Sequence, residues 1–435
     1  MLVVSKKYFP LFLLCFAGLF SCKKDNDLKA PKVTFNSPAD NQSFNVYDYV
    51  HVQAYVTDET QLKTISVTLL DAARNPAYIS VPVNVTGAEM YVNMQYLLDD
   101  IHLNTGLYFM MITASDGEHD THAYKQIYIT AVPRSVKSIY ITSNTTASQT
   151  DLSSVDTALT AITPYHTFSG DHLCSGVSSY YQQFYHCGNY TGAFTGVVLQ
   201  YNTNRFSFAA TPSSVPYFTG FMNDEQDSYI ARYDGAIRGY DDAGSPKFSG
   251  TALSGFYAQH LFLFGDRLFA EEKDITSTAK KLVVYFNTGG LEQSVNMSQD
   301  VVDYCQKDNN SVFVFGNDAG QGVIQLYDKP ANNLWNPYPF PLATGPILSV
   351  LELDPDTYLI AHSNGTIYKY QYSINSVTTY LTGYTAVKLR MDDVNNKLYV
   401  VESNKISRFS YPSLAPAGVV NSAETILDLQ LLYNR

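Results

Sequence analysis

Gly322-Val323-Ile324-Gln325-Leu326-Tyr327-Asp328 is one version of a seven-residue phrase that recurs six times in the last three-fifths of the 435-residue chain. Each version carries an aromatic residue near its end, at Tyr201, Tyr240, Phe286, Tyr327, Tyr370 and Phe409. These aromatic residues follow one another at intervals of 39, 46, 41, 43 and 39 positions. A repeat of roughly 40–45 residues that holds several short strands is typical of one blade of a β-propeller.

The position of the phrase inside its repeat is also predictable. In several units a cluster rich in Asp and Asn leads into an aromatic strand, and the phrase follows that strand. Asp and Asn favour tight turns between strands, so each cluster is predicted to be the first hairpin of a blade. The phrase is then the third strand. The four clearest clusters lie at 224–227, 308–311, 354–356 and 392–396.

The two ends of the repeat region are predicted to complete one another. The six phrase-bearing units occupy about 171–421, which leaves 135–170 at the front and 424–435 at the back. Residues 426–433 form one strongly apolar strand, suited to the innermost position of a blade. We expect it to pair with the segment around 138–142, because ring closure removes exposed sheet edges. The prediction is seven blades, with six or eight as alternatives.

Residues 32–132 have a different pattern and are predicted to form a small β-sandwich. Period-2 strands are expected at 50–56, 62–69, 107–114 and 123–130, separated by short turn-rich stretches. The junction falls at 131–134, where Pro133 cannot continue a central strand. The fold class is therefore all-β, with the sandwich at 32–132 followed by a seven-bladed β-propeller at 134–435.

Three phrases of the N-terminal region support a family resemblance. Asn36-Ser37-Pro38, Ala54-Tyr55-Val56-Thr57-Asp58 and Ala114-Ser115-Asp116-Gly117 resemble bacterial Ig-like domains of the PKD and cadherin-like kind. The resemblance implies a spacer or adhesive module. The Cys, Trp and Cys residues that pin antibody domains are not present in this pattern, so an antibody-type domain is not expected.

The first 22 residues are predicted to be a targeting segment. Lys6 and Lys7 precede an apolar run at 8–20 that is short for a membrane span. Leu19-Phe20-Ser21-Cys22 resembles the lipobox of bacterial lipoproteins, although Phe20 replaces the usual small residue. The resemblance implies cleavage before Cys22 and lipidation of that residue with acyl chains such as palmitate. An ordinary secretory signal with an accidental Cys is the alternative.

The residues after Cys22 resemble those of surface lipoproteins from Bacteroidota-type bacteria. Cys22-Lys23-Lys24-Asp25 is similar to their mature start, which implies export to the outer face of the outer membrane. Residues 23–31 are polar and are expected to act as a tether between lipid and protein. Acyl chains, at about 0.8 kcal/mol per buried CH₂, would hold the chain on the membrane.

Charge and cysteine content limit the partners further. Only 16% of the residues are charged and the net charge is −12, without a basic run beyond the N-terminus, so we expect no nucleic-acid partner. Cys174 and Cys187 are equidistant from Tyr180-Tyr181. If the chain turns there, the two thiols face each other and a disulfide is predicted in an oxidising compartment. Two unpaired buried thiols are the alternative, and Cys305 is expected to be a small core residue.

The polar motifs do not predict a catalytic or metal site. The Asp-rich turns lack the spacing of a calcium loop and are expected to cap their own backbone. His119 and His122 have metal-ligand spacing but are expected in a solvated loop. Glu271 and Glu272, adjacent on a strand, point to opposite faces and are interpreted as solvated loop charge rather than an acid/base pair. We therefore expect no enzyme activity, cofactor or metal.

A tyrosine-rich rim is the sequence's best prediction of a ligand site. Ligand sites of propellers form at the channel mouth, on the loops between blades and between second and third strands. On this reading the ligand-binding residues are Tyr190, Tyr217, Tyr257 and Tyr384, with Tyr233, Phe256, Asn189, Asp318, His362 and Asn404 beside them. Tyr rings stack on the apolar faces of sugars, and hydroxyls and amides bond to sugar hydroxyls. Trp335 is expected on an outer strand or loop.

The expected function is therefore a membrane-anchored, cell-surface binding or scaffold lipoprotein of the outer membrane. Its ligand is expected to be a glycan handled by a nutrient-uptake system. A protein–protein scaffold of the cell envelope is the alternative. A propeller-fold polysaccharide lyase or hydrolase is a third class, which would need His, Tyr or Lys side chains that converge at the channel mouth.

Overall fold

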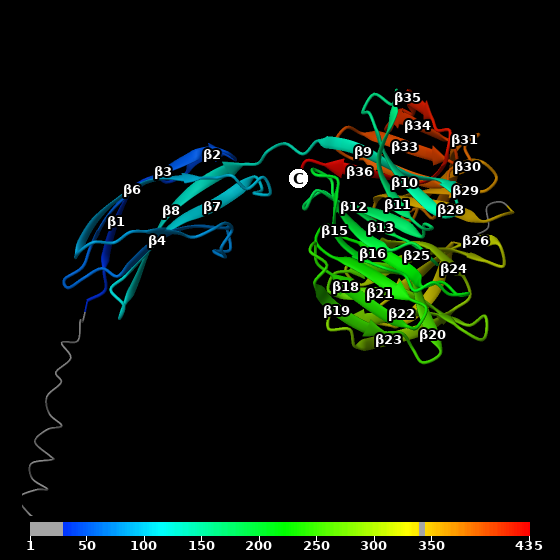
Figure 1. Cartoon of the computed structure of the whole chain (residues 1–435), viewed down its shortest axis with the longest axis horizontal. Coiled ribbons are helices and arrows are strands. Elements are labelled where there is room, and N and C mark those ends of the chain that lie inside the picture. The colour runs from blue at the N-terminus through cyan, green and yellow to red at the C-terminus, as the bar shows by residue number, and fades with distance from the viewer. Residues whose placement is uncertain (1–28, 339–343) are drawn as a thin grey trace, which may run out of the picture. The chain divides into compact units, whose positions relative to one another are not determined.

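The computed structural model describes residues 29–338 and 344–435, which form strands β1 to β36 and no helix. The chain divides into two compact units, Met1–Pro133 and Arg134–Arg435 (Figure 1). The predicted signal segment and the lipidation site at Cys22 lie outside the described residues. In the described part of the chain, no helix is long and apolar enough to cross a membrane.

The N-terminal unit consists of two sheets around one core. The three-stranded sheet has the order β1 (Lys32–Ser37), β3 (Tyr49–Thr57), β6 (Glu89–Leu97). The five-stranded sheet has the order β2 (Gln42–Asn45), β8 (Asp120–Thr130), β7 (Gly106–Ser115), β4 (Thr64–Leu70), β5 (Val81–Val83). The alternating strand pattern arises because every second side chain of a strand faces the core.

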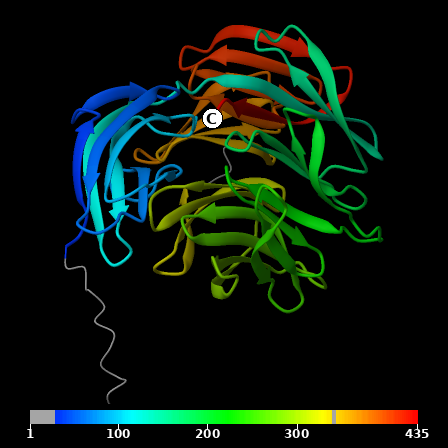
Figure 2. The same ribbon diagram turned by 60° about the vertical axis from the view of Figure 1, so that its left-hand side comes forward.

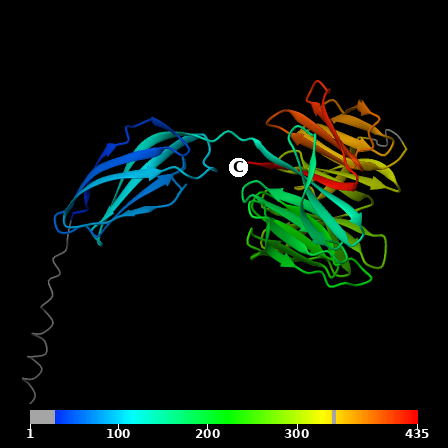
Figure 3. The ribbon, with the colours of Figure 1, turned by 45° about the horizontal axis from the view of Figure 1, so that its top comes forward.

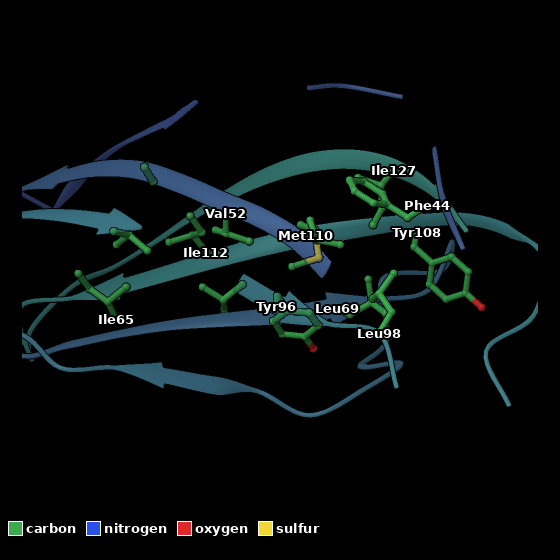
Figure 4. Packing of buried hydrophobic residues seen from close by; sticks show 14 of the residues in the cluster. Phe44, Val52, Ile65, Leu69, Tyr96, Leu98, Tyr108, Met110, Ile112 and Ile127 are labelled. Atoms are coloured by element: carbon green, nitrogen blue, oxygen red, sulfur yellow. The ribbon is translucent and has the colours of Figure 1, made fainter. Parts of the chain in front are cut away.

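Figure 4 shows how both sheets of this unit contribute side chains to a shared core. Val52 of β3 and Tyr96 of β6 pack with Ile65, Met110 and Ile112 of the five-stranded sheet. The sequence predicted β3, β4, β7 and β8 but not β1, β2, β5 or β6. The assignment of this unit to the Ig-like domains stays a prediction.

The second unit is a β-propeller built from seven four-stranded antiparallel sheets. From the innermost strand outward, blade 1 has β36 (Thr425–Tyr433), β9 (Val136–Thr146), β10 (Gln149–Val155) and β11 (Ile162–Ser169). Blade 2 has β12 (Cys174–Ser178), β13 (Gln183–Cys187), β14 (Phe194–Val198) and β15 (Thr203–Phe208). Blade 3 has β16 (Phe218–Asn223), β17 (Ser228–Arg232), β18 (Ala236–Tyr240) and β19 (Pro246–Thr251).

The remaining four blades follow the same order without exception. Blade 4 has β20 (Phe256–Phe264), β21 (Arg267–Asp274), β22 (Lys280–Phe286) and β23 (Leu291–Met297). Blade 5 has β24 (Asp300–Gln306), β25 (Ser311–Asp318), β26 (Gln321–Asp328) and β27 (Asn333–Tyr338). Blade 6 has β28 (Ile347–Asp354), β29 (Thr357–His362), β30 (Thr366–Gln371) and β31 (Ser376–Thr382). Blade 7 has β32 (Lys388–Asp392), β33 (Lys397–Glu402), β34 (Lys405–Ser410) and β35 (Ala415–Asn421).

The blades close into a ring through their innermost strands. Each innermost strand contacts the next, in the order β36, β12, β16, β20, β24, β28, β32 and back to β36. Figure 2 shows the sheets following one another around a common centre. The C-terminal strand, red in Figures 1 and 3, lies beside the cyan-green strands that begin the propeller. Its register places Leu429 opposite Ile141. The predicted seven-bladed closure is confirmed.

The order of strands and turns within each blade also agrees with the sequence repeat. The six phrases coincide with the third strands β14, β18, β22, β26, β30 and β34. The four Asp-rich clusters connect first to second strands. All loops from second to third strands, and all loops from an outermost strand to the next innermost strand, therefore emerge on one face of the propeller. We call it the upper face.

We predict that closure depends on the burial of β36. Leu429 is fully buried, so Leu429→Ala should lower the free energy of unfolding by about 2–5 kcal/mol. Urea unfolding of the full chain measures this change. Val419→Ala, on the exposed outer strand β35, is the control and should change the free energy by less than about 0.5 kcal/mol. A similar loss in both variants would contradict a special role for β36.

Candidate functional site

The four predicted ligand-binding tyrosines all lie on or next to upper-face loops. Tyr190 is in the loop between β13 and β14, and Tyr217 ends the loop between β15 and β16. Tyr257 stands at the start of β20, and Tyr384 lies in the loop between β31 and β32. Whether they bind a ligand stays a prediction, but the structure shows which of them are neighbours.

Three of the four tyrosines belong to a connected row across blades 2 to 4, which Tyr233 completes. The amide of Tyr217 donates to the carbonyl of Asn189, beside Tyr190, at 2.8 Å. The amide of Tyr233 donates to the carbonyl of Tyr217 at 3.2 Å. The rings of Tyr233 and Tyr257 then lie 4.9 Å apart between centroids. We call Tyr190, Tyr217, Tyr233 and Tyr257 the aromatic row.

A cleft of about 310 Å³ opens beside the aromatic row, between blades 2 and 3. Its walls include Phe208, Tyr217, Arg232 and Tyr240. The guanidinium carbon of Arg232 lies 5.1 Å from the centroid of the Tyr217 ring, which is a cation–π distance. Arg232 also pairs with Asp234, but its buried Nε has no partner among the described residues. The cleft thus offers aromatic faces and one directional donor.

Tyr384 lies apart from this row, on blades 6 and 7. Its ring packs edge-on against Phe409 at 5.5 Å, and Lys405 Nζ lies 5.4 Å from its centroid. Two other residues expected at the rim are engaged internally. His362 ends β29, is fully buried and bonds to the Gly345 carbonyl at 3.0 Å. Asp318 accepts a hydrogen bond from Ser298 at 2.7 Å. Trp335 lies on the outermost strand β27, as expected.

Asp171 fixes the loop that carries Tyr190. Its carboxylate accepts backbone hydrogen bonds from Asn189, Tyr190, Thr191 and Gly192 at 2.7–3.1 Å. Burial of the carboxyl group opposes its ionisation, but the four amide donors outweigh burial and lower the pKa of Asp171 to about 2. A Cβ on Gly192 would lie 2.3 Å from the Asp171 carbonyl oxygen, so only glycine fits there.

We predict that Asp171→Asn loosens this loop in a pH-dependent way. The folded state lowers the pKa from 3.8 to about 2, so the carboxylate stabilises the fold above pH 4 and loses that effect as the pH falls towards 2. At pH 7 the variant should lose roughly 1–3 kcal/mol of unfolding free energy. Urea titrations at several pH values test this. The loss should shrink below pH 4, whereas Asp318→Asn, the control, should show a smaller loss at pH 7.

The interpretation of Glu271 and Glu272 as solvated loop charge was wrong. Both lie on β21 and are fully buried. They do point to opposite faces: Glu271 bonds to His260 Nδ1 at 2.7 Å, and Glu272 bonds to the Tyr285 hydroxyl and to the Leu253 amide. Both faces are interior because the neighbouring blades cover them. Burial raises the pKa of Glu272.

His260 and Glu271 begin an ionic network at the upper end of blade 4. Lys273 Nζ lies 3.4 Å from Glu271 and 2.7 Å from Asp300, and Lys280 also binds Asp300 at 2.8 Å. Burial raises the pKa of Tyr257, whose surroundings include Lys273 and Glu271. A part-exposed imidazole held by a buried carboxylate is chemically able to accept or donate a proton. The sequence reasoning missed this network.

A second buried charge that the sequence did not predict lies where blades 1, 2 and 7 meet. Asp428 of β36 accepts hydrogen bonds from Ser175 at 3.0 Å and Gln430 at 2.8 Å, and pairs with Arg390 at 3.3 Å. Arg390 Nε also donates to the Leu429 carbonyl at 2.9 Å. Burial opposes the charge of Asp428, but Arg390 and Lys388 lower its pKa. The innermost strands of three blades are joined by this network.

The two predicted disulfide partners stand opposite each other. The register of β12 with β13 pairs Cys174 with Cys187, so the predicted hairpin is correct. Both thiols are free in the structure, as is buried Cys305. Burial raises the pKa of Cys174 and, more strongly, that of Cys187. The disulfide stays a prediction, and its geometry is available without a change of register.

We predict that protein exported to an oxidising compartment carries the Cys174–Cys187 bond. Mass spectrometry of peptides from non-reduced protein should find the two cysteines linked. The bond should raise the free energy of unfolding by up to about 3 kcal/mol, because it restricts the unfolded chain. Cys305→Ser is the control, since it leaves the pair intact. Quantitative labelling of both thiols in exported protein would contradict the prediction.

The polar turns behave as backbone caps. Asp356 accepts hydrogen bonds from the amide and hydroxyl of Ser373 at 2.6 and 2.7 Å, and Asp392 accepts from the amides of Val394 and Asn395. His122 bonds to Thr113 on the neighbouring strand at 3.0 Å. Among the described residues, no group of three or more His, Cys, Asp or Glu side chains is arranged to hold a metal ion.

Comparisons with known proteins agree at the level of the fold. A protein from Lactobacillus plantarum is similar with a TM-score of 0.52 and 13% identity, covering 68% of this chain and all of that one. A quinonprotein alcohol dehydrogenase-like protein from Bacteroides thetaiotaomicron has a TM-score of 0.46 and 12% identity, covering 93% of this chain and 99% of that one. The WD40 β-propeller domain of Doa1 has a TM-score of 0.47 and 11% identity, covering 60% and 85%.

The sequence comparisons do not add a family. No protein-family model matches the chain, and no curated protein matches it. At these identities the structural likenesses concern the fold alone. The chain is thus an all-β protein with a β-propeller, and its function has to be argued from its own side chains.

Proposed function

We propose that the protein is a lipid-anchored binding protein of the bacterial outer membrane that presents its propeller at the cell surface and binds glycans. The aromatic row and its cleft carry this proposal. Three of the predicted tyrosines lie on neighbouring upper-face loops, and a cleft of about 310 Å³ opens beside them. A volume of this size suits one or two sugar rings.

The chemistry of the cleft favours a saccharide over an apolar ligand. Phe208 and Tyr240 are stacked with ring centroids 4.7 Å apart, and Tyr217 presents a further ring. Such rings pack against the C–H faces of a sugar. The guanidinium of Arg232, whose side chain is 32% exposed and lines the cleft, is able to donate to a ring oxygen, a hydroxyl or a carboxylate. The lipid anchor at Cys22 and the location at the cell surface are further parts of the proposal, and the sequence resemblance alone supports them.

Two other functions remain as second candidates. A protein–protein scaffold of the cell envelope would use the same exposed tyrosines, because Tyr is favoured at protein interfaces as well. A lyase or hydrolase would need a proton-transfer group, and His260 with buried Glu271 is the observation that favours it. The aromatic cleft lies between blades 2 and 3 whereas this pair lies on blade 4, so we place the enzyme last.

We predict that single substitutions distinguish the aromatic row, which contributes to ligand binding, from the other tyrosines of the upper face, which do not. Tyr217→Ala and Arg232→Gln should each weaken binding of a glycan at least about tenfold, because each removes a direct contact worth about 1.4 kcal/mol or more. A glycan array identifies the ligand, and calorimetry with the best oligosaccharide measures affinity. Tyr384→Ala is the matched control and should bind normally, since it lies on blades 6 and 7.

The outcomes distinguish the candidates. Absence of signal from the whole array, together with an envelope protein captured in a Tyr217-dependent manner, would replace the glycan by a protein partner. Equal losses from Tyr217→Ala and Tyr384→Ala would remove the assignment of the cleft. Cleavage of the oligosaccharide that is abolished by His260→Ala would establish the enzyme.

A further inference from the structure

The outer face of the three-stranded sheet in the N-terminal unit carries three exposed tyrosines. Tyr49 and Tyr55 of β3 are 61% and 41% exposed, and Tyr91 of β6 is 52% exposed. They point outward because exposed and buried residues alternate along both strands, and the residues between them face the core. We call the outward-facing side chains of β1, β3 and β6 the tyrosine platform.

The register of the strands puts the exposed tyrosines at two places along the platform. Tyr55 stands directly opposite Tyr91, and Thr34 of β1 lies on its other side. Tyr49 stands opposite Leu97, six residues before Tyr55 on β3, which is a distance of about 20 Å in an extended strand. Two aromatic contacts at this distance suit a chain of several units better than one small molecule.

Uncharged hydrogen-bonding groups lie between the tyrosines. Gln53 stands opposite Asn93, and His51 stands opposite Gln95. His51 Nε2 and Asn93 Oδ1 are 2.7 Å apart, and an amide oxygen only accepts, so the imidazole is the donor. The NH₂ group of Asn93 therefore keeps its two donors, and the glutamine amides both donate and accept. The middle of the platform thus presents groups that suit hydroxyls.

The rings of the platform are uncovered, unlike the aromatic rings on the other sheet of the same unit. On the outer face of the five-stranded sheet, the guanidinium carbon of Arg74 lies 5.5 Å from the Phe109 centroid and 5.1 Å from that of Tyr124. In the described part of the chain, no cation or second aromatic ring packs in this way on the platform tyrosines. The Tyr55 hydroxyl donates to Glu89 at 2.7 Å, which orients that ring.

The charge and the size of the platform limit its partner. Lys32 and Glu89, its only charged side chains within β1, β3 and β6, lie at one end, on either side of Thr57. Three strands about 4.8 Å apart, the longest of nine residues, cover roughly 400 Å². A stable protein interface buries about 800 Å² on each partner. The platform is therefore small for a folded partner and offers a charged ligand no countercharge in its middle.

We propose that the tyrosine platform binds a neutral polysaccharide chain that lies along β3 and β6. The rings of Tyr49 at one end and of Tyr55 and Tyr91 at the other stack on the C–H faces of sugar rings. The amides between them bond to sugar hydroxyls. The platform belongs to the N-terminal unit and shares no residue with the aromatic cleft, so the inference does not rest on the proposed function of the propeller.

Affinity electrophoresis of the full chain, in gels that contain a soluble polysaccharide, measures this binding. Galactomannan, xyloglucan, arabinoxylan and mixed-linkage β-glucan are the neutral probes, and alginate is the anionic comparison. At least one neutral polymer should retard the chain, and alginate should retard it less. Tyr217→Ala should be retarded as strongly as the unaltered chain. Loss of retardation in that variant would assign the binding to the aromatic cleft and not to the platform.

Variants on the two sheets test the contact. Tyr91→Ala and Tyr49→Ala should each weaken binding at least about tenfold, and Tyr91→Phe, which keeps the ring, should bind normally. Asn93→Ala should also weaken binding, which provides the test if Tyr91→Ala does not fold. Tyr128→Ala is the matched control, because Tyr128 is 43% exposed on β8 of the other sheet, and should bind normally.

Four further results would overturn the proposal. The first is that no neutral polymer retards the chain, and the second is that alginate retards it more strongly than every neutral polymer. The third is an equal loss of binding in Tyr91→Ala and Tyr128→Ala. The fourth is self-association of the full chain, seen by sedimentation velocity, that Tyr91→Ala abolishes, which would assign the platform to a contact between two copies.

Discussion

The pairing of β36 with β9 is the interaction on which the propeller depends. It joins residues almost three hundred positions apart and supplies the innermost strand of blade 1. The guanidinium of Arg134 lies 3.7 Å above the Tyr433 ring, and Ser135 and Asn434 bond to each other through their backbones, so the two ends of the propeller are fastened side by side. Because the ring is closed, every blade presents the same two kinds of loop to the upper face.

This closure explains why so much of the fold could be predicted from the sequence. A propeller repeats one local object, the four-stranded sheet, and the repeated phrase marks its third strand. The apolar run 426–433 had no partner within its own repeat, which indicated a strand that completes a distant blade. In the N-terminal unit the missed strand β6 also alternates between exposed and inward-facing residues, but it buries only Val92 and Tyr96 fully, whereas β3 buries four residues.

The charged interior could not be predicted in the same way. The alternation of side chains along a strand correctly predicted that Glu271 and Glu272 point to opposite faces. It does not indicate whether neighbouring blades cover both of those faces. Their partners, His260 and Tyr285, lie on the strands β20 and β22 on either side. Asp428 and Ser175 are separated by 253 positions and meet only because the ring closes. Burial of a charge is therefore decided by packing between blades, which the sequence around the charged residue does not indicate.

Loop length explains why the aromatic cleft lies beside blade 2. The loop between β13 and β14 has six residues, 188–193, and the loop between β15 and β16 has nine, 209–217. In blade 5, by contrast, the loop between the second and third strands has only two residues, 319–320. Longer loops carry side chains such as Tyr190 and Tyr217 away from the sheet and leave space between blades. Asp171 and the close packing at Gly192 hold the first of these loops in place. Arg232, whose guanidinium lies beside the Tyr217 ring, adds to this cleft a cation that is able to pair with an acidic group.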